Sequence, residues 1–219
     1  LQQALRNLVN QKEFTQTHNA QANPQLLKLT QALAHGGNPN SFKSIPWAEI
    51  NAALPYGNDP DSKAKRLKLW PQVDQNNNGY ASLAEVDKAI RDVLRIDAVF
   101  NCKRAILQAF TAAKNSQKSK STRGKDYLER GEFRLFLYYL RQYFEYSQAF
   151  TLADTSDDHK ISLKEFLSVQ STMEKWVGKI GNPLAEFKKI DKNGGGMITF
   201  GEFVQWAMAK SLDIGEGDK

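Results

Sequence analysis

Apolar residues recur at helical spacing along most of this chain, in segments that are separated by short polar loops. The first two segments, residues 1–12 and 25–35, predict short amphipathic helices, and Gly36-Gly37 ends the second of them. No pattern in this stretch indicates a chemical function. We therefore expect residues 1–45 to form an N-terminal helical extension that packs on the main domain or on a partner.

From Pro46 onward the apolar pattern predicts longer helices. Pro46 suits the first turn of a helix that has Trp47 on its inner face. A basic helix follows the loop that ends at Pro60, and Pro71 is expected to kink its last turn or to end it early. The residues expected on the inner face of this basic helix are Leu67, Leu69, Trp70 and Val73.

Further helices are expected downstream. Residues 98–113 predict one amphipathic helix, and residues 132–153 predict one long helix rich in Phe and Tyr. An aromatic stripe at helical spacing usually fills a core, although it can also bind a partner. The remaining helices are expected at residues 161–176, from Asn182-Pro183 onward and at residues 203–212.

Two of the loops between these helices follow one twelve-residue design. The design has oxygen-bearing side chains at positions 1, 3, 5 and 9, a turn residue at 6, a backbone carbonyl ligand at 7 and a glutamate at 12. Ca²⁺ takes about six to eight oxygen ligands, which a short loop supplies when alternate residues point inward, so this spacing is typical of an EF-hand calcium loop. The candidate ligands are Asp154, Ser156, Asp158, the carbonyl of Lys160 and Glu165 in one loop, and Asp191, Asn193, the carbonyl of Met197 and Glu202 in the other.

A loop of the same design lies earlier in the chain. Its candidate ligands are Asp74, Asn76, Asn78, the carbonyl of Tyr80 and Glu85. Two of these ligands are neutral asparagines, so the lower ligand charge predicts weaker calcium binding. Position 8 is Ala81, a poor strand former, which predicts weak pairing with the neighbouring loop.

A further loop is expected to start at Lys114, because the residues before it repeat those before Asp154. Its closing half is kept in Leu128 and Glu132, but its opening half is too long and carries lysines where carboxylates belong. We predict that this second loop binds no calcium. The basic insertion at Lys114–Lys125 is either a mobile cationic arm for an acidic surface or a tolerated disordered insertion.

Four helix–loop–helix units predict an all-α fold built of two EF-hand pairs, with a short two-residue β pairing between the loops of each pair. The expected divisions are an extension at 1–45, an N-terminal pair at 46–140 and a C-terminal pair at 141–219. We expect Ca²⁺ in the loops that start at Asp74 and Asp154 and weaker binding at Asp191, with affinities roughly micromolar or weaker. His159 at a turn position costs about 1 kcal/mol, and Gly195 leaves position 5 to a water.

Charge and composition limit the classes of partner that the protein is expected to bind. The 219-residue chain carries a net charge of +6 and has an isoelectric point near 9.3, which is unusual for a calcium-binding chain. The charge fits an acidic partner surface such as tubulin, nucleic acid or anionic lipid, or else a solvated lysine-rich surface. Cys102 is the single cysteine, so a reducing compartment is expected. The first residues of the sequence, from Leu1, do not have the pattern of a signal peptide, and we expect the true N-terminus to be missing or processed.

A narrower resemblance lies in motifs outside the calcium ligands. These are Trp47-x-x-Ile50, Leu54-Pro55, the basic helix into Asp74, Gly131-Glu132-Phe133-Arg134-Leu135, Trp176, and Ile198-Thr-Phe200-x-Glu202-Phe203-x-x-Trp206-Ala207. Between about Pro46 and Asp213 the chain resembles the calflagins, the flagellar calcium-binding proteins. The resemblance implies a flagellar or ciliary protein. Calflagins are acylated at an N-terminal glycine and cysteine, so membrane association is expected here only if a missing N-terminus is acylated.

Calflagin-like domains also resemble EF-hand proteins that are bound inside axonemal doublet microtubules. We therefore expect a structural component of the axoneme, on the cytoplasmic side, with tubulin or other axonemal proteins as partners and no nucleic acid. The alternative is a calcium sensor at the flagellar membrane or on a target helix, but methionines, which are common in adaptable sensor grooves, are few. No nucleophile–base constellation, phosphate loop or zinc spacing predicts an enzyme.

Overall fold

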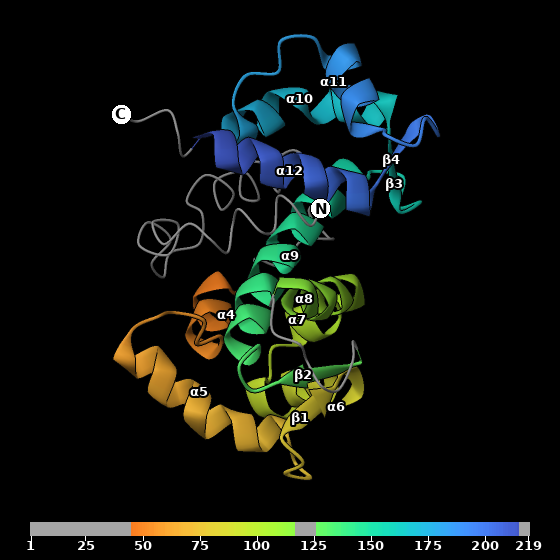
Figure 1. Cartoon of the computed structure of the whole chain (residues 1–219). Coiled ribbons are helices and arrows are strands. Elements are labelled where there is room, and N and C mark those ends of the chain that lie inside the picture. Colours follow the sequence, from red (N-terminus) through yellow and green to blue (C-terminus); the bar gives the residue numbers. More distant parts are fainter. Residues whose placement is uncertain (1–44, 117–125, 215–219) are drawn as a thin grey trace. The chain divides into compact units, whose positions relative to one another are not determined.

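The computed structural model describes residues 45–116 and 126–214 (Figure 1). The N-terminal extension expected at 1–45 and most of the basic insertion lie outside the described residues. The described chain forms two compact units, which divide between Phe144 and Glu145, within one helix. Each unit is described by itself below.

The first unit contains most of the helices and one pair of strands. Its elements are α4 (Trp47–Ala53), α5 (Pro60–Val73), β1 (Tyr80–Ser82), α6 (Leu83–Ala89), the π-helix η1 (Ile90–Leu94), α7 (Asp97–Phe100), α8 (Lys103–Ser116), β2 (Tyr127–Glu129) and the first part of α9 (Phe133–Ala153). The order helix, loop, strand, helix occurs twice, as α5–β1–α6 and α8–β2–α9. This is the arrangement of a pair of EF-hands.

The second unit repeats the arrangement with fewer elements. It consists of the end of α9, β3 (Lys160–Ser162), α10 (Leu163–Val177), α11 (Pro183–Ile190), β4 (Met197–Thr199) and α12 (Phe200–Ile214). Together the two units confirm the predicted all-α fold with short strands only.

Strand pairing joins the loops within each unit. β1 pairs antiparallel with β2 and places Ala81 opposite Leu128, while β3 pairs antiparallel with β4 and places Ile161 opposite Ile198. All four of these side chains are fully buried. The pairings are three residues long, one more than expected, and Ala81 takes part in its pairing despite its low strand preference.

Local sequence explains where the helices start. Asp59 caps α5 by accepting a hydrogen bond from the Ser62 backbone at 2.7 Å, and Pro60 follows it at the first helical position. Asn182 caps α11 through the Ala185 backbone, also with a proline next. Both starts combine a capping side chain with a residue whose fixed φ suits the first turn. The helix start predicted at Asn182-Pro183 is confirmed.

Two details of the helix pattern were wrong, and of the two alternatives expected at Pro71 the early end does not occur. Helix α5 continues past Pro71 to Val73, because a proline in the last turn leaves the next bond intact and Asp74 N–H still reaches the Trp70 carbonyl at 2.9 Å. Leu67 is 47% exposed, since it lies roughly a third of a turn away from the buried face of α5. The single helix expected over residues 98–113 is divided into α7 and α8 at Asn101-Cys102.

The aromatic residues of α9 are mostly core. In the first unit Phe144 packs against Trp47 and Phe133 against Trp70, with ring centroids 5.5 and 5.3 Å apart. In the second unit Phe150 meets Phe203 at 5.6 Å. These rings are buried, which confirms the core interpretation of the stripe.

Candidate metal centres

The three intact loops begin in the same way, at the end of a helix. In each, the aspartate at position 1 donates its backbone N–H to the carbonyl four residues earlier at 2.9 Å. These bonds run from Asp74 to Trp70, from Asp154 to Phe150 and from Asp191 to Phe187. The helix therefore fixes the backbone of the first ligand before the chain turns.

The carboxylate at position 1 then organises the turn. Its two oxygens accept the backbone N–H groups of positions 5 and 6. The donors are Asn78 (3.0 Å) and Gly79 (2.9 Å) to Asp74, Asp158 (3.2 Å) and His159 (2.9 Å) to Asp154, and Gly195 (3.0 Å) and Gly196 (2.8 Å) to Asp191. Asp74 and Asp154 are buried, so these bonds hold anionic side chains inside the loops.

Two residues in each loop have a left-handed backbone. Position 6 was expected to be one of them, and His159 has φ of +66°. Position 4 was not anticipated, yet all three loops have positive φ there. The position 4 residues are Asn77 (+54°), Asp157 (+58°) and Gly194 (+68°). Asn, Asp and Gly are the residues that tolerate this conformation best, so their recurrence at position 4 was the available signal.

The glutamate at position 12 is held by the residue at position 9. One carboxylate oxygen accepts both the backbone N–H and the hydroxyl of that residue, at 2.7–2.9 Å. The pairs are Ser82 with Glu85, Ser162 with Glu165 and Thr199 with Glu202. For Glu85 and Glu165 the arrangement is a capping box at the start of the outgoing helix. The Ser/Thr-x-x-Glu spacing could have predicted this role from the sequence.

The second oxygen of the same glutamate faces the opening of the loop. In the first loop it accepts from Asn76 Nδ2 at 3.1 Å, and in the fourth from the Asn193 backbone at 3.1 Å. In the third loop the Ser156 backbone donates to Glu165 at 2.9 Å. Positions 3 and 12 are thus brought together in each intact loop, and in the third loop Ser156 Oγ also donates to Asp154 Oδ1 at 3.5 Å.

Hydrogen bonds keep these carboxyl groups ionised. Burial raises the pKa of Glu165, but the hydrogen bonds from Ser162 and Ser156 outweigh this effect and hold the pKa at about 2. The same opposition between burial and hydrogen bonds from Thr199 and Asn193 lowers the pKa of Glu202. Both groups are therefore anionic at neutral pH, as a cation ligand must be.

The remaining predicted ligands lie between the turn and the strand. The position 5 side chains of Asn78 and Asp158 accept the backbone N–H of Tyr80 at 3.1 Å and of Lys160 at 2.9 Å. Met197 is the first residue of β4, as Tyr80 and Lys160 are of β1 and β3. These position 7 residues therefore stand where the turn joins the strand pairing.

Gly195 shows why the fourth loop lacks a side-chain ligand at position 5. Its N–H donates to Asn193 Oδ1 at 2.7 Å, and a Cβ added at Gly195 would lie 2.6 Å from that oxygen. A side chain at position 5 would therefore require the Asn193 amide to shift.

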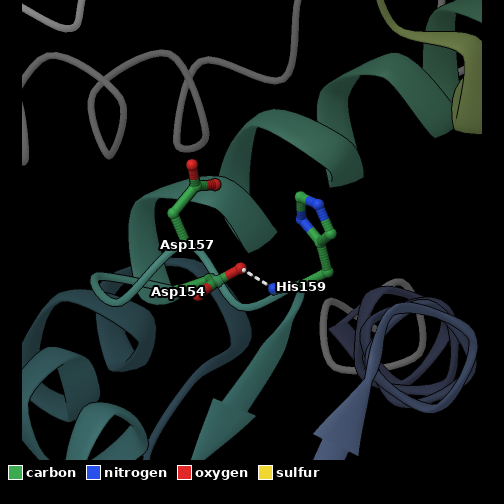
Figure 2. A group of neighbouring side chains, drawn as sticks. All are labelled: Asp154, Asp157 and His159. Atoms are coloured by element: carbon green, nitrogen blue, oxygen red, sulfur yellow. Dashed lines mark hydrogen bonds between the residues drawn. The ribbon is translucent and has the colours of Figure 1, made fainter.

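Asp154, Asp157 and His159 form a small polar group on the third loop (Figure 2). The one hydrogen bond drawn between them runs from the His159 backbone to the Asp154 carboxylate. Asp157 and His159 are exposed and occupy the two left-handed positions. Their place in the loop explains their proximity, and they add no ligand to the set at positions 1, 3, 5, 7 and 12.

The second loop has a different opening. Lys114 stands at position 1, and its ammonium lies 2.8 and 3.0 Å from the two carboxylate oxygens of Glu132. The closing half keeps the usual form, since Glu129 N–H donates to Glu132 at 2.8 Å and Leu128 pairs with Ala81.

The donor chemistry of the three intact loops fits Ca²⁺. All the side-chain donors are oxygens, as a hard cation requires. The third loop offers three carboxylates, and the first and fourth loops offer two each. The carboxylates are Asp154, Asp158 and Glu165 in the third loop, Asp74 and Glu85 in the first, and Asp191 and Glu202 in the fourth.

None of the helices in the described parts of the chain has the length and apolar character needed to cross a bilayer.

Comparison with known proteins agrees with this geometry. The FCaBP EF-hand domain matches residues 50–140. The chain is 33% identical over 174 residues to the flagellar calcium-binding protein of Trypanosoma cruzi, and the aligned region covers 78% of this chain and 82% of that protein. It is 32% identical over 180 residues to flagellar calcium-binding protein TB-24 of Trypanosoma brucei brucei, covering 81% and 83% respectively. The chain therefore belongs to the family of flagellar calcium-binding proteins, EF-hand proteins whose cofactor is Ca²⁺.

Proposed function

We propose that this chain is a calcium-binding protein of the flagellum or cilium that serves as a structural component of the axoneme, bound to doublet microtubules. The proposal of a flagellar site rests on the names of its relatives, which cover most of its length. The proposal of a binding role rather than an enzymatic one rests on the family and on loops that have the donor set of a calcium site.

The basic face of α5 is the observation that carries the axonemal role. Lys63, Lys65 and Lys68 are exposed on this helix, and none of them pairs with a carboxylate among the residues that the structure describes. Leu67 is exposed among them. Arg66 instead donates twice to the loop before the helix and steadies it. An exposed helix surface that carries three lysines and one leucine suits an acidic protein surface such as the tubulin lattice.

Calcium binding then modulates a protein whose attachment is electrostatic. The third loop has the highest ligand charge and binds most tightly, the first loop binds with two carboxylates, and the fourth binds weakly because position 5 is Gly195. Attachment through α5 uses none of these ligands. It should therefore depend on ionic strength more than on calcium.

Co-sedimentation with microtubules tests the proposal. The full chain is spun with microtubules across a salt series, with calcium and with chelator. The variant Lys63→Glu/Lys65→Glu/Lys68→Glu reverses the face of α5, and Lys188→Glu/Lys189→Glu reverses two exposed lysines of α11 as a control. Loss of binding in the first variant alone, at all calcium levels, supports the proposal.

Two outcomes contradict the axonemal role. If neither variant changes sedimentation, α5 is not the contact. If the protein binds only an amphipathic target peptide, or acidic vesicles, and does so only with calcium, it acts as a sensor instead.

A further inference from the structure

The Lys114–Glu132 pair occupies a defined place in the pattern of the four loops. Lys114 is at position 1 and Glu132 at position 12, which in the intact loops are the first and last ligands of the ion. Only 4% and 5% of the two side chains are exposed. The pair is therefore a buried salt bridge between the two ends of a calcium loop.

The carboxylate of Glu132 is presented as in the intact loops. Glu129 at position 9 donates its backbone N–H to Glu132 at 2.8 Å, as Ser82 does to Glu85 at 2.8 Å and Thr199 to Glu202 at 2.9 Å. The strand before it pairs normally with β1. The closing half of the second loop is thus built to face a cation.

The cation that faces this carboxylate is a side chain of the protein itself, the ammonium of Lys114. Lys114 Nζ donates hydrogen bonds to both carboxylate oxygens of Glu132. α8 extends two residues beyond Lys114, to Ser116, whereas α5, α9 and α11 each end directly before position 1. The lysine therefore reaches the carboxylate from within a helix rather than from a turn.

We propose that the ammonium of Lys114 is the built-in cation of the second loop and takes the place of Ca²⁺ opposite Glu132. The carboxylate of Glu132 is then neutralised at every calcium concentration. The pairing of β1 with β2 stands without an ion in the second loop, and β1 always meets a strand β2 whose following carboxylate is already paired. The inference concerns this chain's own residues and holds whatever the protein binds in the cell.

Charge, rather than packing, is what the proposal requires of Lys114. A buried carboxylate that loses its partner is strongly unfavourable, whereas removal of both partners is much less so. The informative set is therefore Lys114→Met, which keeps the length of the side chain, Lys114→Arg, which keeps the charge, and the double variant Lys114→Met/Glu132→Gln. Lys103→Met is the control, because Lys103 also pairs from α8, with Asp87 at 2.6 Å, but is exposed.

The readout is hydrogen exchange of the peptides that contain Ala81 and Leu128, measured on the full chain in chelator. Lys114→Met should speed exchange in both peptides, and ammonium chloride should slow it again where sodium chloride at equal ionic strength does not. Lys114→Arg, Lys103→Met and the double variant should stay close to the parent protein.

Several results would overturn the proposal. One is unchanged exchange in Lys114→Met. Another is equal loss in Lys114→Met and in the double variant, since that would make the side chain a packing element. A third is faster exchange on calcium removal in a Glu85→Gln variant, whose first loop binds no ion, because the second loop would then depend on calcium.

Discussion

Trp206 donates its indole N–H to the carboxylate of Glu186 at 2.7 Å, and this bond joins the two helices that flank the fourth loop. Glu186 lies on α11 and Trp206 on α12, and Lys210 also reaches the carboxylate at 3.2 Å. Burial raises the pKa of Glu186, but the bonds from Trp206 and Lys210 outweigh it and the net pKa is lowered. The fourth loop, which has the fewest side-chain ligands, is thus supported from its flanking helices.

Trp206→Phe should lower the free energy of unfolding by about 1.5–3 kcal/mol, because it removes a hydrogen bond to a charged group while keeping a ring against Phe166 and Phe203. Urea unfolding measures the change. In a Glu186→Gln background the same substitution should have a smaller effect. Equal effects in the two backgrounds would show that the loss comes from packing alone.

Glu165→Gln should abolish calcium binding by the third loop. The amide keeps one acceptor oxygen, whereas Glu165 uses both oxygens and its charge. Isothermal calorimetry should show one site fewer. Glu174→Gln, on the same helix α10, is the matched control and should leave the number of sites unchanged. Unchanged stoichiometry and heat in Glu165→Gln would contradict the assignment of Glu165 as a calcium ligand of the third loop.

His159→Gly and Gly79→Ala should move stability in opposite directions. Both residues are at position 6, with φ of +66° and +89°. Relief of left-handed strain of roughly 1–2 kcal/mol exceeds the entropic penalty of roughly 0.5–1 kcal/mol that glycine brings. We expect a small gain for His159→Gly and a loss of about 1 kcal/mol for Gly79→Ala.

Thermal and urea unfolding of the calcium-free protein measure both position 6 variants. No atom lies within 4 Å of a Cβ built at Gly79, so a loss there reports backbone strain rather than a clash. Lys160→Gly, next to His159 but in the strand, controls for flexibility and should be destabilising. A loss in His159→Gly would mean that the histidine side chain contributes more than its backbone strain removes.

Alkaline pH should destabilise the first unit through Tyr143. Burial, with a smaller contribution from Tyr139, raises the pKa of Tyr143 to about 12, from 10.0. The folded protein therefore resists loss of this proton, so its contribution to stability is complete below pH 10 and falls as pH rises towards 12. Tyrosinate absorbance should include a late-titrating component that Tyr143→Phe reduces by one group. Titration of every tyrosine near the usual pKa would contradict this.

The ligand positions could be predicted from the sequence because calcium chemistry fixes both residue type and spacing. Asp154, Ser156 and Glu165 come together as that spacing requires. The left-handed backbone at position 4 was not predicted. Asparagine and aspartate, which stand there as Asn77 and Asp157, are common in loops of every kind, and the calcium-loop pattern specifies no residue at this position. A search for residues that tolerate positive φ would have found them.

Helix geometry and tertiary contacts account for the rest of the differences. Leu67 counted as inner on hydrophobicity alone, but its angle on α5 places it outside the buried face. The break at Asn101-Cys102 interrupts a segment whose apolar spacing is continuous. From the sequence, Lys114 indicated only that a calcium ligand is missing. Its contact with Glu132 could not be predicted, because the loop between them does not have the usual length. Their meeting depends on the pairing of β1 with β2.

That strand pairing has a consequence for the length of the second loop. Lys114 to Glu132 covers nineteen positions, against twelve from Asp74 to Glu85, yet β2 keeps its register with β1. Closing a chain segment of nineteen residues instead of twelve costs only about 0.4 kcal/mol in loop entropy. The second loop is therefore a place where the chain can gain or lose residues, or accept an inserted tag, with little effect on folding.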